Sequence, residues 1–520
     1  MLLLILAVSL ARIAYLAWLC PYTLLEDEAH YWEWSRHLDW SYYSKPPGIA
    51  ALIAASTSLF GHTEFAVRLP AVLCSALAAL SLAGLARDTL PDKRAGFFAA
   101  AVFQLVPLFQ STSLLMTIDM PYAACWSMAA WLAWRAFTRA GLGWVVAAGL
   151  AAAAGLTFKH TMVLLLPGLL AFAILVKPAG SPTLRSTRTK AVVIAAVSLL
   201  GLLPNIIWNA QRDWPTARHL LGHLGLSGGD VKPTQSASGY HYDPSWTLEF
   251  IGTQVALAGP MLVLALTGWR ALGPGAPRLF LACCGAPIIL LYLGVSFVTE
   301  PEGNWAFAGY TTLTVLAAWS VVQGMESVLA ARRAWAALPA PKPKAGFLRK
   351  EPESVAQIAW HATLVFGLIA GLGILRMDLL AKLPAIGPRI PISRLMGADQ
   401  MAAHVARLQT DLRTQTPNVE PLVISQFYGR ASQLAFYLPG HPTVYCSGSR
   451  MGGRKSQYDL WPHTDLSNPA LAGRSAVLLG DADQDWSWGF TSVTPRGKLD
   501  GDRKRNREAF TALEYTPPAR

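Results

Sequence analysis

Residues 1–20 read MLLLILAVSLARIAYLAWLC, and shortly after them residues 26–48 read EDEAHYWEWSRHLDWSYYSKPPG. The first stretch is apolar over the roughly 20 residues that an α-helix needs to cross the hydrocarbon core of a bilayer. The second mixes charged residues with tryptophan and tyrosine, which concentrate at headgroup depth. The order predicts a spanning helix, retained in the mature chain, that emerges into an interfacial segment, part of it a helix along the membrane surface.

The rest of the chain repeats the apolar signal. Of 520 residues, 53% are hydrophobic and 14% are charged, whereas soluble proteins have roughly 25% charged residues. The sequence therefore predicts a polytopic α-helical membrane protein with about 11–13 transmembrane helices. The eleven spans that can be marked are 2–20, 64–86, 95–112, 117–136, 143–158, 161–176, 191–209, 247–268, 279–298, 305–325 and 355–376.

Basic residues lie mainly in short connections on one predicted side of these spans. The positive-inside rule makes that side cytoplasmic and places the N-terminus there too. This distribution explains the net charge of +12 without a nucleic-acid partner. The basic connections contain Arg87, Lys93, Arg94, Arg135, Arg139, Lys177, Arg185, Arg188, Lys190, Arg270, Arg278, Arg332, Arg333, Lys342, Lys344, Arg349 and Lys350.

Residues 377–520 differ from the part before them, because they are richer in charged and turn residues. The strand-like runs PLVIS, TVYC and SAVLLGD alternate with helical patterns such as ADQMAAHVARLQTDL. We expect a C-terminal α/β domain on the extracytoplasmic side. Residues 1–376 would form the transmembrane domain, with its first extracytoplasmic loop at 21–63.

Two groups of acidic residues fall at membrane boundaries on the same predicted side. Glu26, Asp27 and Glu28 follow the first span, and Asp119 is the sole acidic residue between Asp92 and Asp213. An acidic side chain near lipid is costly unless it is paired or functional. A solvated negative cap at the triplet remains open, as does an Asp119 carboxylate satisfied by a neighbouring threonine or a helix N-terminus.

Further polar residues are predicted on that side. Lys45 precedes two prolines, which disfavour a helix at this lysine and leave a stiff point charge suited to a phosphate. Snorkelling of the lysine to the interface is the alternative. His160 has metal-ligand chemistry, but a structural histidine fits its surroundings better. The other polar candidates are Tyr43, Lys159, Arg212, Glu302 and Asn304.

Several motifs together resemble bacterial GT-C glycosyltransferases, the relatives of protein O-mannosyltransferases and of the aminoarabinose transferases that modify lipid A. The resemblance covers nearly the whole chain, and the order of its motifs is more specific than any one of them. The motifs are DEAHYWEWSRHLDWSYYSKPPGIAALIA, GHTEFAVRLPAVL, TIDMPY, FKHTMVLLLPGLL, LPNIIWNAQRDWP, EPEGNWAFAGY, LAFYLPGHPTVYC and SQYDLWP.

This resemblance implies an inverting transfer of a sugar from a polyprenyl-phosphate donor to lipid A, another envelope glycan or a protein. The site would face the periplasm from the bacterial inner membrane. By matching position, Asp27 would be a catalytic carboxylate with Glu28 beside it, Asp119 a second site acid, and Lys45 the contact to the donor phosphate. A divalent metal is bound in some members, and Asp27, Glu28 and His160 are its weak candidate ligands here.

Two other classes of function stay open at this stage. A transporter or flippase of lipid-linked glycans would place charged residues near the bilayer midplane and interrupt paired helices in related halves. A glycan-binding scaffold without catalysis would not need separated acids beside a lysine. The acids at one face of the membrane favour the transferase.

Overall fold

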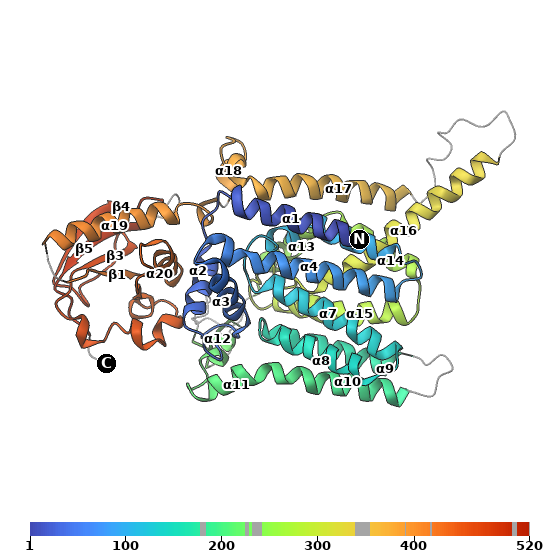
Figure 1. Cartoon of the computed structure of the whole chain (residues 1–520), viewed down its shortest axis with the longest axis horizontal. Coiled ribbons are helices and arrows are strands. Elements are labelled where there is room, and N and C mark those ends of the chain that lie inside the picture. Colours follow the sequence, from blue (N-terminus) through green and yellow to red (C-terminus); the bar gives the residue numbers. More distant parts are fainter. Residues whose placement is uncertain are drawn as a thin grey trace. The chain divides into compact units, whose positions relative to one another are not determined.

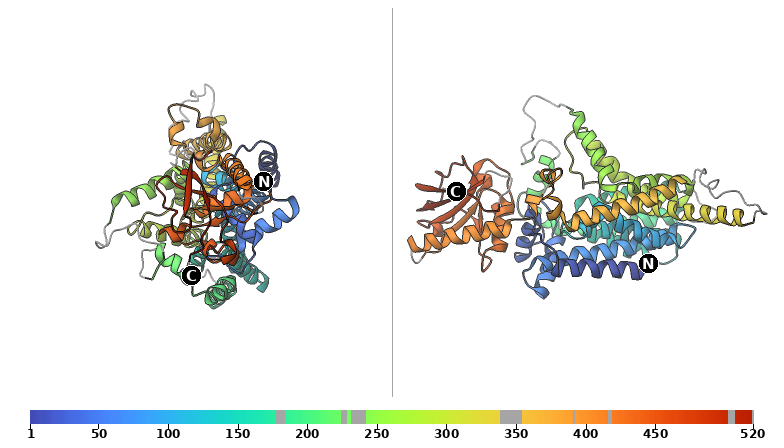
Figure 2. Two further views of the ribbon diagram at one scale, coloured as in Figure 1. Left: turned by 90° about the vertical axis from the view of Figure 1, so that its left-hand side faces the viewer. Right: turned by 90° about the horizontal axis from the view of Figure 1, so that it is seen from above.

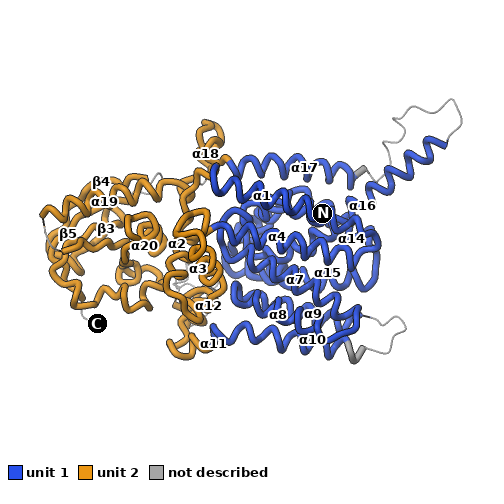
Figure 3. The backbone as a smooth tube through the Cα atoms, viewed as in Figure 1, with its two compact units in different colours: residues 1–18, 68–206, 237–375 blue, residues 19–67, 207–236, 376–520 orange. Residues whose placement is uncertain are grey.

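Fourteen apolar or amphipathic helices make up most of the first of two units in the computed structural model (Figure 1). The structure describes residues 1–176, 184–223, 228–230, 242–337, 354–390, 392–415, 419–501 and 507–518. Unit 1 comprises residues 1–18, 68–206 and 237–375, and unit 2 comprises residues 19–67, 207–236 and 376–520 (Figure 3). Helices α4 (Glu64–Thr89) and α11 (Leu203–Ala210) each contain residues of both units.

The helices of unit 1 follow the predicted spans in order. Short 3-10 segments, His160–Leu164 and Leu200–Leu202, join some of them. The α-helices are α1 (Leu2–Trp18), α4 (Glu64–Thr89), α5 (Ala95–Leu105), α6 (Pro107–Thr112), α7 (Asp119–Thr138), α8 (Leu142–Leu156), α9 (Leu165–Leu175), α10 (Leu184–Leu199), α11 (Leu203–Ala210), α13 (Pro244–Ala258), α14 (Met261–Leu272), α15 (Ala276–Val295), α16 (Gly309–Ala336) and α17 (Ser354–Leu375).

Each predicted span coincides with helix, so the predicted fold class is confirmed, but several spans are shorter or broken. Among the described residues, five helical stretches are long and apolar enough to cross a membrane: Glu64–Thr89, Thr187–Ala210, Ala276–Val295, Gly309–Ala336 and Val355–Leu375. A sixth would be α13 with α14, which meet at an angle of 85°. The count of eleven or more crossings therefore stays a prediction.

The broken spans have local causes. The stretch predicted as one span at 247–268 divides at Gly259, whose φ of +59° lies in the left-handed region that favours glycine. The stretch predicted at 95–112 ends its first helix at Leu105, because Pro107 lacks the N–H that a continuous helix would need. The polar pair Lys159 and His160 separates α8 from α9, as the sequence predicted.

Unit 2 combines short helices with a small sheet. Its 3-10 segments are Gly387–Arg389, Ile392–Arg394, Gly448–Met451, Gln457–Asp459, Pro462–Thr464 and Pro469–Leu471. The helices are α2 (Glu26–Arg36), α3 (Gly48–Phe60), α12 (Pro215–His223), α18 (Met377–Leu380), α19 (Ala398–Gln415) and α20 (Tyr428–Tyr437). The strands are β1 (Leu422–Ser425), β2 (Tyr445–Cys446), β3 (Ala476–Asp481), β4 (Ser492–Lys498) and β5 (Arg507–Leu513).

The five strands have the order β2-β1-β3-β5-β4. Strands β2, β1 and β3 run parallel, whereas β5 pairs antiparallel with both β3 and β4. Helix α19 packs against β3 and β5, and Figure 2 shows it beside the sheet. The buried residues Leu422, Ile424, Leu478 and Phe510 belong to the core of this domain. An α/β domain at the C-terminus is therefore confirmed.

The aromatic residues after the first helix build the interior of unit 2. Trp32 and Trp34 on α2 are fully buried, as is Tyr42, whose ring stacks on Trp34 at a centroid distance of 4.4 Å. The prediction that these residues are headgroup anchors is wrong for all three. Trp40, with 63% of its surface exposed, remains compatible with that role. The periodicity of apolar residues along a helix does not show that the helix is buried on several sides. That burial depends on elements that are distant in the sequence.

Helices α2 and α20 approach closely enough to place their first residues together. A Cβ added at Gly429 would lie 2.7 Å from the Cβ of Glu26, so glycine permits the contact. His30 supports it from α2, because its Nδ1 lies 2.9 Å from the Ser432 hydroxyl and its ring lies 4.7 Å from that of Tyr428. The C-terminal domain thus supplies one wall beside the acidic start of α2.

Candidate active site

Asp27 is the second residue of α2 and is exposed, unlike the glutamate that follows it. It has no hydrogen bond or ion pair with any residue that the structure describes. Surrounding protein nevertheless raises the pKa of Asp27 through loss of hydration, against the opposing charge of Lys45. An accessible carboxylate with a raised pKa and unoccupied oxygens can accept a proton from a bound molecule.

Positive charges from three parts of unit 2 act on that carboxylate. After the loss of hydration, Lys45 has the largest effect on the pKa of Asp27, and Arg454 and Arg394 also lower it. The backbone of Lys45 is fixed, because its carbonyl accepts from the Tyr42 N–H at 3.1 Å and from the hydroxyl of Ser41 at 3.3 Å. Lys45 is half-buried, which suits a lysine that holds an anion at the edge of a site.

The other two acids of the triplet have partners. Glu26 lies 3.3 Å from the guanidinium of Arg430 on α20. Glu28 is fully buried and accepts a hydrogen bond of 2.9 Å from the Leu25 N–H, which caps the start of its own helix. Asp27 therefore offers the unoccupied carboxylate of the triplet, while Glu28 has a structural contact that the sequence did not reveal.

Tyr43 and Arg212 bind acidic residues of unit 2. The Tyr43 hydroxyl donates to Asp230 at 2.6 Å, and the Tyr43 N–H donates to the side chain of Gln457 at 2.7 Å. Arg212 lies 3.2 Å from Asp39, and the Trp208 indole donates to the same carboxylate oxygen at 2.7 Å. Burial raises the pKa of Tyr43, so this hydroxyl stays a donor at physiological pH.

A second polar cluster lies in unit 1, around Asp119 at the start of α7. One Asp119 oxygen accepts from the Lys159 ammonium at 2.9 Å, and the other accepts from the Asn304 amide at 2.8 Å. The Asp119 and Lys159 side chains are 3% and 11% exposed. The structure thus joins three residues that the sequence singled out, although 185 positions separate Asp119 from Asn304. Thr117, the partner considered from the sequence, contributes at 3.4 Å.

The remaining predicted residues are less engaged. Glu302 is exposed and has no side-chain hydrogen bond or ion pair in the described part of the chain. His160 begins the 3-10 segment after Lys159. A search of the described residues finds no group of three or more histidine, cysteine, aspartate or glutamate side chains that could hold a metal ion.

Arg454 and Arg394 are the residues of this site that sequence reasoning missed. Arg454 follows Gly452 and Gly453 in the loop after β2, and Gly452 has a φ of +76°. A glycine-rich basic turn directly after a predicted strand was the available signal. Its relation to Asp27, more than 400 positions earlier in the chain, was not visible without the fold.

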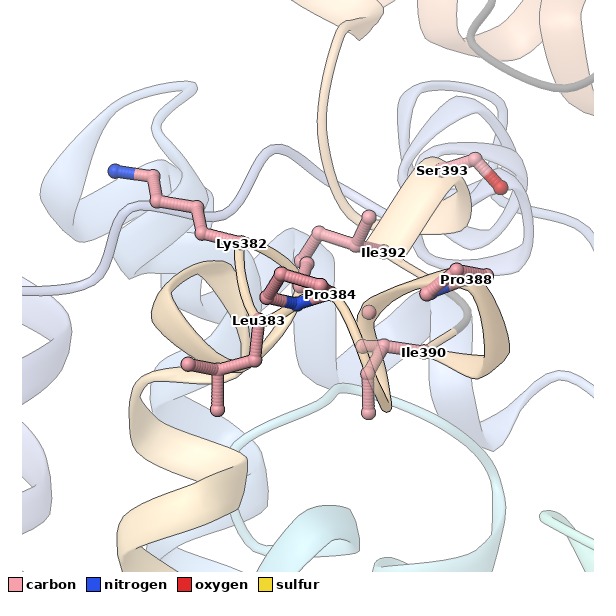
Figure 4. Close-up of a pocket in the computed structure, with 9 residues that line it drawn as sticks. Lys382, Leu383, Pro384, Pro388, Ile390, Ile392 and Ser393 are labelled. Carbon is pink, nitrogen blue, oxygen red and sulfur yellow. The ribbon is translucent and has the colours of Figure 1, made fainter.

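A pocket of about 400 Å³ lies in the chain that follows α18 (Figure 4). Its walls are mostly apolar, with Lys382 and Ser393 as its polar side chains, and it contains neither a carboxylate nor an imidazole. It therefore offers no general base for a transfer reaction. The lining residues are Ala381, Lys382, Leu383, Pro384, Gly387, Pro388, Ile390, Ile392 and Ser393.

Comparison of the sequence with known families and proteins relates this chain to sugar transferases. Residues 44–208 match the family described as dolichyl-phosphate-mannose-protein mannosyltransferase. Over 307 residues the chain is 29% identical to the lipid A galacturonosyltransferase RgtD of Rhizobium johnstonii, covering 56% of this chain and 59% of RgtD. Over 158 residues it is 32% identical to an undecaprenyl phosphate-alpha-4-amino-4-deoxy-L-arabinose arabinosyl transferase of Enterobacter, covering 27% and 28%.

Solved structures give the fold. ArnT from Cupriavidus metallidurans bound to undecaprenyl phosphate superposes with a TM-score of 0.62 at 19% identity, covering 98% of this chain and 97% of ArnT. The archaeal oligosaccharyltransferase AglB from Archaeoglobus fulgidus reaches 0.53 at 12% identity, covering 92% and 69%. The chain has the GT-C fold and is related to O-mannosyltransferases and aminoarabinose transferases, as the resemblance implied. It is a multi-pass membrane protein.

Proposed function

We propose that this chain transfers a sugar from a polyprenyl-phosphate donor to an envelope acceptor (lipid A, another glycan or a protein) on the periplasmic face of the inner membrane. The observation that carries the proposal is the exposed, unbonded carboxylate of Asp27 beside Lys45. The names of the related proteins support transfer of a sugar from undecaprenyl phosphate, and of sugars to lipid A. Since the aligned part spans about 59% of RgtD, the activity is inferred for this chain and not carried over.

The chemistry follows from the charges around Asp27. An acceptor oxygen forms a bond to the anomeric carbon as the bond from that carbon to the phosphate oxygen breaks, which inverts the configuration. Asp27 takes the proton of an acceptor hydroxyl, and the polyprenyl phosphate leaves with the bonding electron pair. Lys45 stabilises the negative charge on the leaving phosphate. For an acceptor that is already a phosphate anion, Asp27 orients the nucleophile and takes no proton.

Asp119 has a different task in this proposal. Both of its oxygens already accept hydrogen bonds, one of them from a cation. A carboxylate whose two oxygens are occupied in this way is suited to holding its partners in place. We assign Asp119 to positioning Lys159 and Asn304, with which its two oxygens form hydrogen bonds.

The proposed reaction does not use a divalent metal. No group of three or more histidine, cysteine, aspartate or glutamate side chains that could hold a metal ion occurs among the described residues, and Glu28, one of the candidate ligands, caps its own helix. No step of the proposed reaction is therefore routed through a metal. Metal removal from the purified protein by a chelator is expected to leave transfer unchanged.

The transferase is favoured over a flippase by the position of the unbonded acid. Asp27 belongs to a short helix outside the apolar stretches that could span a membrane, whereas a transporter uses charged residues near the bilayer midplane. The related proteins also carry the names of transferases.

The test uses the purified full chain in detergent or nanodiscs, with polyprenyl-phosphate sugars as donors and an extract of envelope glycolipids as the acceptor. Mass spectrometry of the products, alongside envelopes from cells with and without the gene, identifies what is modified. Transfer that is absent with every donor, together with no binding of undecaprenyl phosphate, would reject the proposed function.

A further inference from the structure

We propose that Arg454 binds a carboxylate on the donor sugar, so that the chain selects an acidic sugar, a hexuronic acid. The inference rests on the proposed function and deepens it by naming the substrate class. The two sugars in the names of the related proteins differ in charge, since a galacturonosyl group carries a carboxylate and 4-amino-4-deoxy-arabinose carries an amine. The residues around Asp27 discriminate between these possibilities.

The guanidinium of Arg454 is held in place by Tyr428. Its Nη2 donates to the Tyr428 hydroxyl at 3.3 Å, and its Cζ lies 5.3 Å from the centre of that ring. Tyr428 begins α20 and contacts His30 of α2, three residues after Asp27. The chain of contacts therefore fixes Arg454 to the helix pair that presents the proposed base.

Arg454 is exposed and has no ion pair with a carboxylate in the part of the chain that the structure describes. Its charge nevertheless acts on Asp27, Tyr43 and Tyr428 alike, which places it among the groups of the site. An arginine that is held by a tyrosine and has no ion pair in the described part of the chain can bind an anion from outside the chain.

The neighbouring acids already have partners. Glu26 pairs with Arg430, Asp230 accepts from Tyr43, and Asp459 accepts from the backbone N–H of Ser456 at 2.7 Å. Asp27, which has no such partner in the described part of the chain, is assigned to the reaction. Arg454 is exposed and has no ion pair in that part of the chain, so its guanidinium can bind a carboxylate of the sugar.

The different shapes of lysine and arginine indicate which side chain binds the phosphate and which binds the carboxylate. Lys45, a compact charge made stiff by the two prolines after it, suits the phosphate. The planar guanidinium of Arg454 has two parallel N–H groups that match a carboxylate in a bidentate pair. Two anions on one donor would thus have separate binding groups.

The experiment compares two donors that differ only at the sugar C6: undecaprenyl phosphate-galacturonate and undecaprenyl phosphate-galactose. The wild-type chain is expected to use galacturonate with a kcat/KM at least about tenfold higher, since a lost charged hydrogen bond is worth about that factor. Arg454→Ala should lower kcat/KM for galacturonate by about tenfold or more, mainly through KM, and should lower the value for galactose by a clearly smaller factor, because only the effect of Arg454 on Asp27 is lost there. Arg454→Lys should recover part of the loss.

Lys455→Ala is the matched control, because it removes the adjacent exposed charge and that lysine has no hydrogen bond or ion pair in the described part of the chain. It should leave both donors unchanged. Equal losses with both donors in Arg454→Ala would show a phosphate contact or a structural role and overturn the proposal, as would a wild-type chain that prefers galactose. Those results still include transfer, so they differ from failure of the proposed function, in which neither donor reacts.

Discussion

At the scale of single residues, Asp27 and Asp119 have opposite environments although the sequence suggested both as site acids. Asp27 is exposed and unbonded among the described residues, whereas Asp119 is buried between a lysine and an amide. Their positions beside apolar stretches were visible in the sequence. The environments were not, because each depends on contacts with residues 40 or more positions away in the chain, or on the absence of such contacts.

We expect Asp27→Asn to lower kcat by about 10²-fold or more, the contribution of a general base, without loss of stability. Loss of hydration to the surrounding protein raises the pKa of Asp27, so its ionised form costs folding free energy at any pH above the unfolded pKa, and the substitution removes that cost. The same raised pKa requires activity with a hydroxyl acceptor to fall as the pH drops through it. Transfer rates across pH and a thermal melt of each form measure both effects. A variant with full activity would exclude Asp27 as the base.

Asp119→Asn should behave differently, because it leaves the Lys159 ammonium buried without its counter-charge. Breaking a buried ion pair on one side costs about 3–5 kcal/mol, so we expect a clear loss of thermal stability. Adding Lys159→Met to the Asp119→Asn variant should restore part of the thermal stability, but it should not restore transfer of the sugar. A melting temperature equal to that of the wild type in the single variant would contradict the assigned positioning role of Asp119.

At the scale of elements, the close approach of α2 and α20 determines whether Asp27 and Arg454 share a site. Gly429→Ala would place a Cβ 2.7 Å from the Cβ of Glu26, which forces the helices apart. Overpacking of this kind costs about 1–3 kcal/mol, and we expect it to weaken donor binding. Gly252→Ala on α13 is the control, since its added Cβ would meet nothing within 4 Å. Thermal melts and binding of undecaprenyl phosphate compare the two, and equal behaviour would refute the argument.

Elements were predictable where their pattern was local. The apolar runs predicted the helices of unit 1, and the runs PLVIS, TVYC and SAVLLGD predicted β1, β2 and β3. Strands β4 and β5 were missed. β4 is exposed along nearly its whole length and includes Pro495 and Gly497 at a bulge, so neither alternation nor apolar content marks it. The break at Gly259 was missed because a glycine alone does not reveal that a positive φ will be adopted.

At the scale of the whole molecule, the division into units unites segments that the sequence kept apart. Residues 19–67 and 207–236 belong to the same unit as residues 376–520. The sequence predicts the first two as separate loops on the same side as the C-terminal domain, and their membership of one unit agrees with that prediction. The basic connections that support this orientation are only partly described, since Lys177, Lys342, Lys344, Arg349 and Lys350 lie outside the described residues.

The orientation itself can be measured with single cysteines in a variant whose six native cysteines are replaced. Lys498→Cys, exposed on β4 of unit 2, should react with a membrane-impermeant maleimide in cells whose outer membrane alone has been permeabilised. Lys93→Cys, exposed between α4 and α5, should react only after the inner membrane is opened, because the positive-inside rule places its connection in the cytoplasm.

Comparable expression and donor binding of the two variants would ensure that the labelling reports on a folded chain. A polyprenyl donor held at the periplasmic face can reach Asp27 only when unit 2 lies on that side. Labelling in the reverse order would move Asp27, Lys45 and Arg454 to the cytoplasm together, since all three belong to unit 2. It would leave the chemistry of the site intact but require a cytoplasmic acceptor, and it would therefore overturn the proposed envelope substrate.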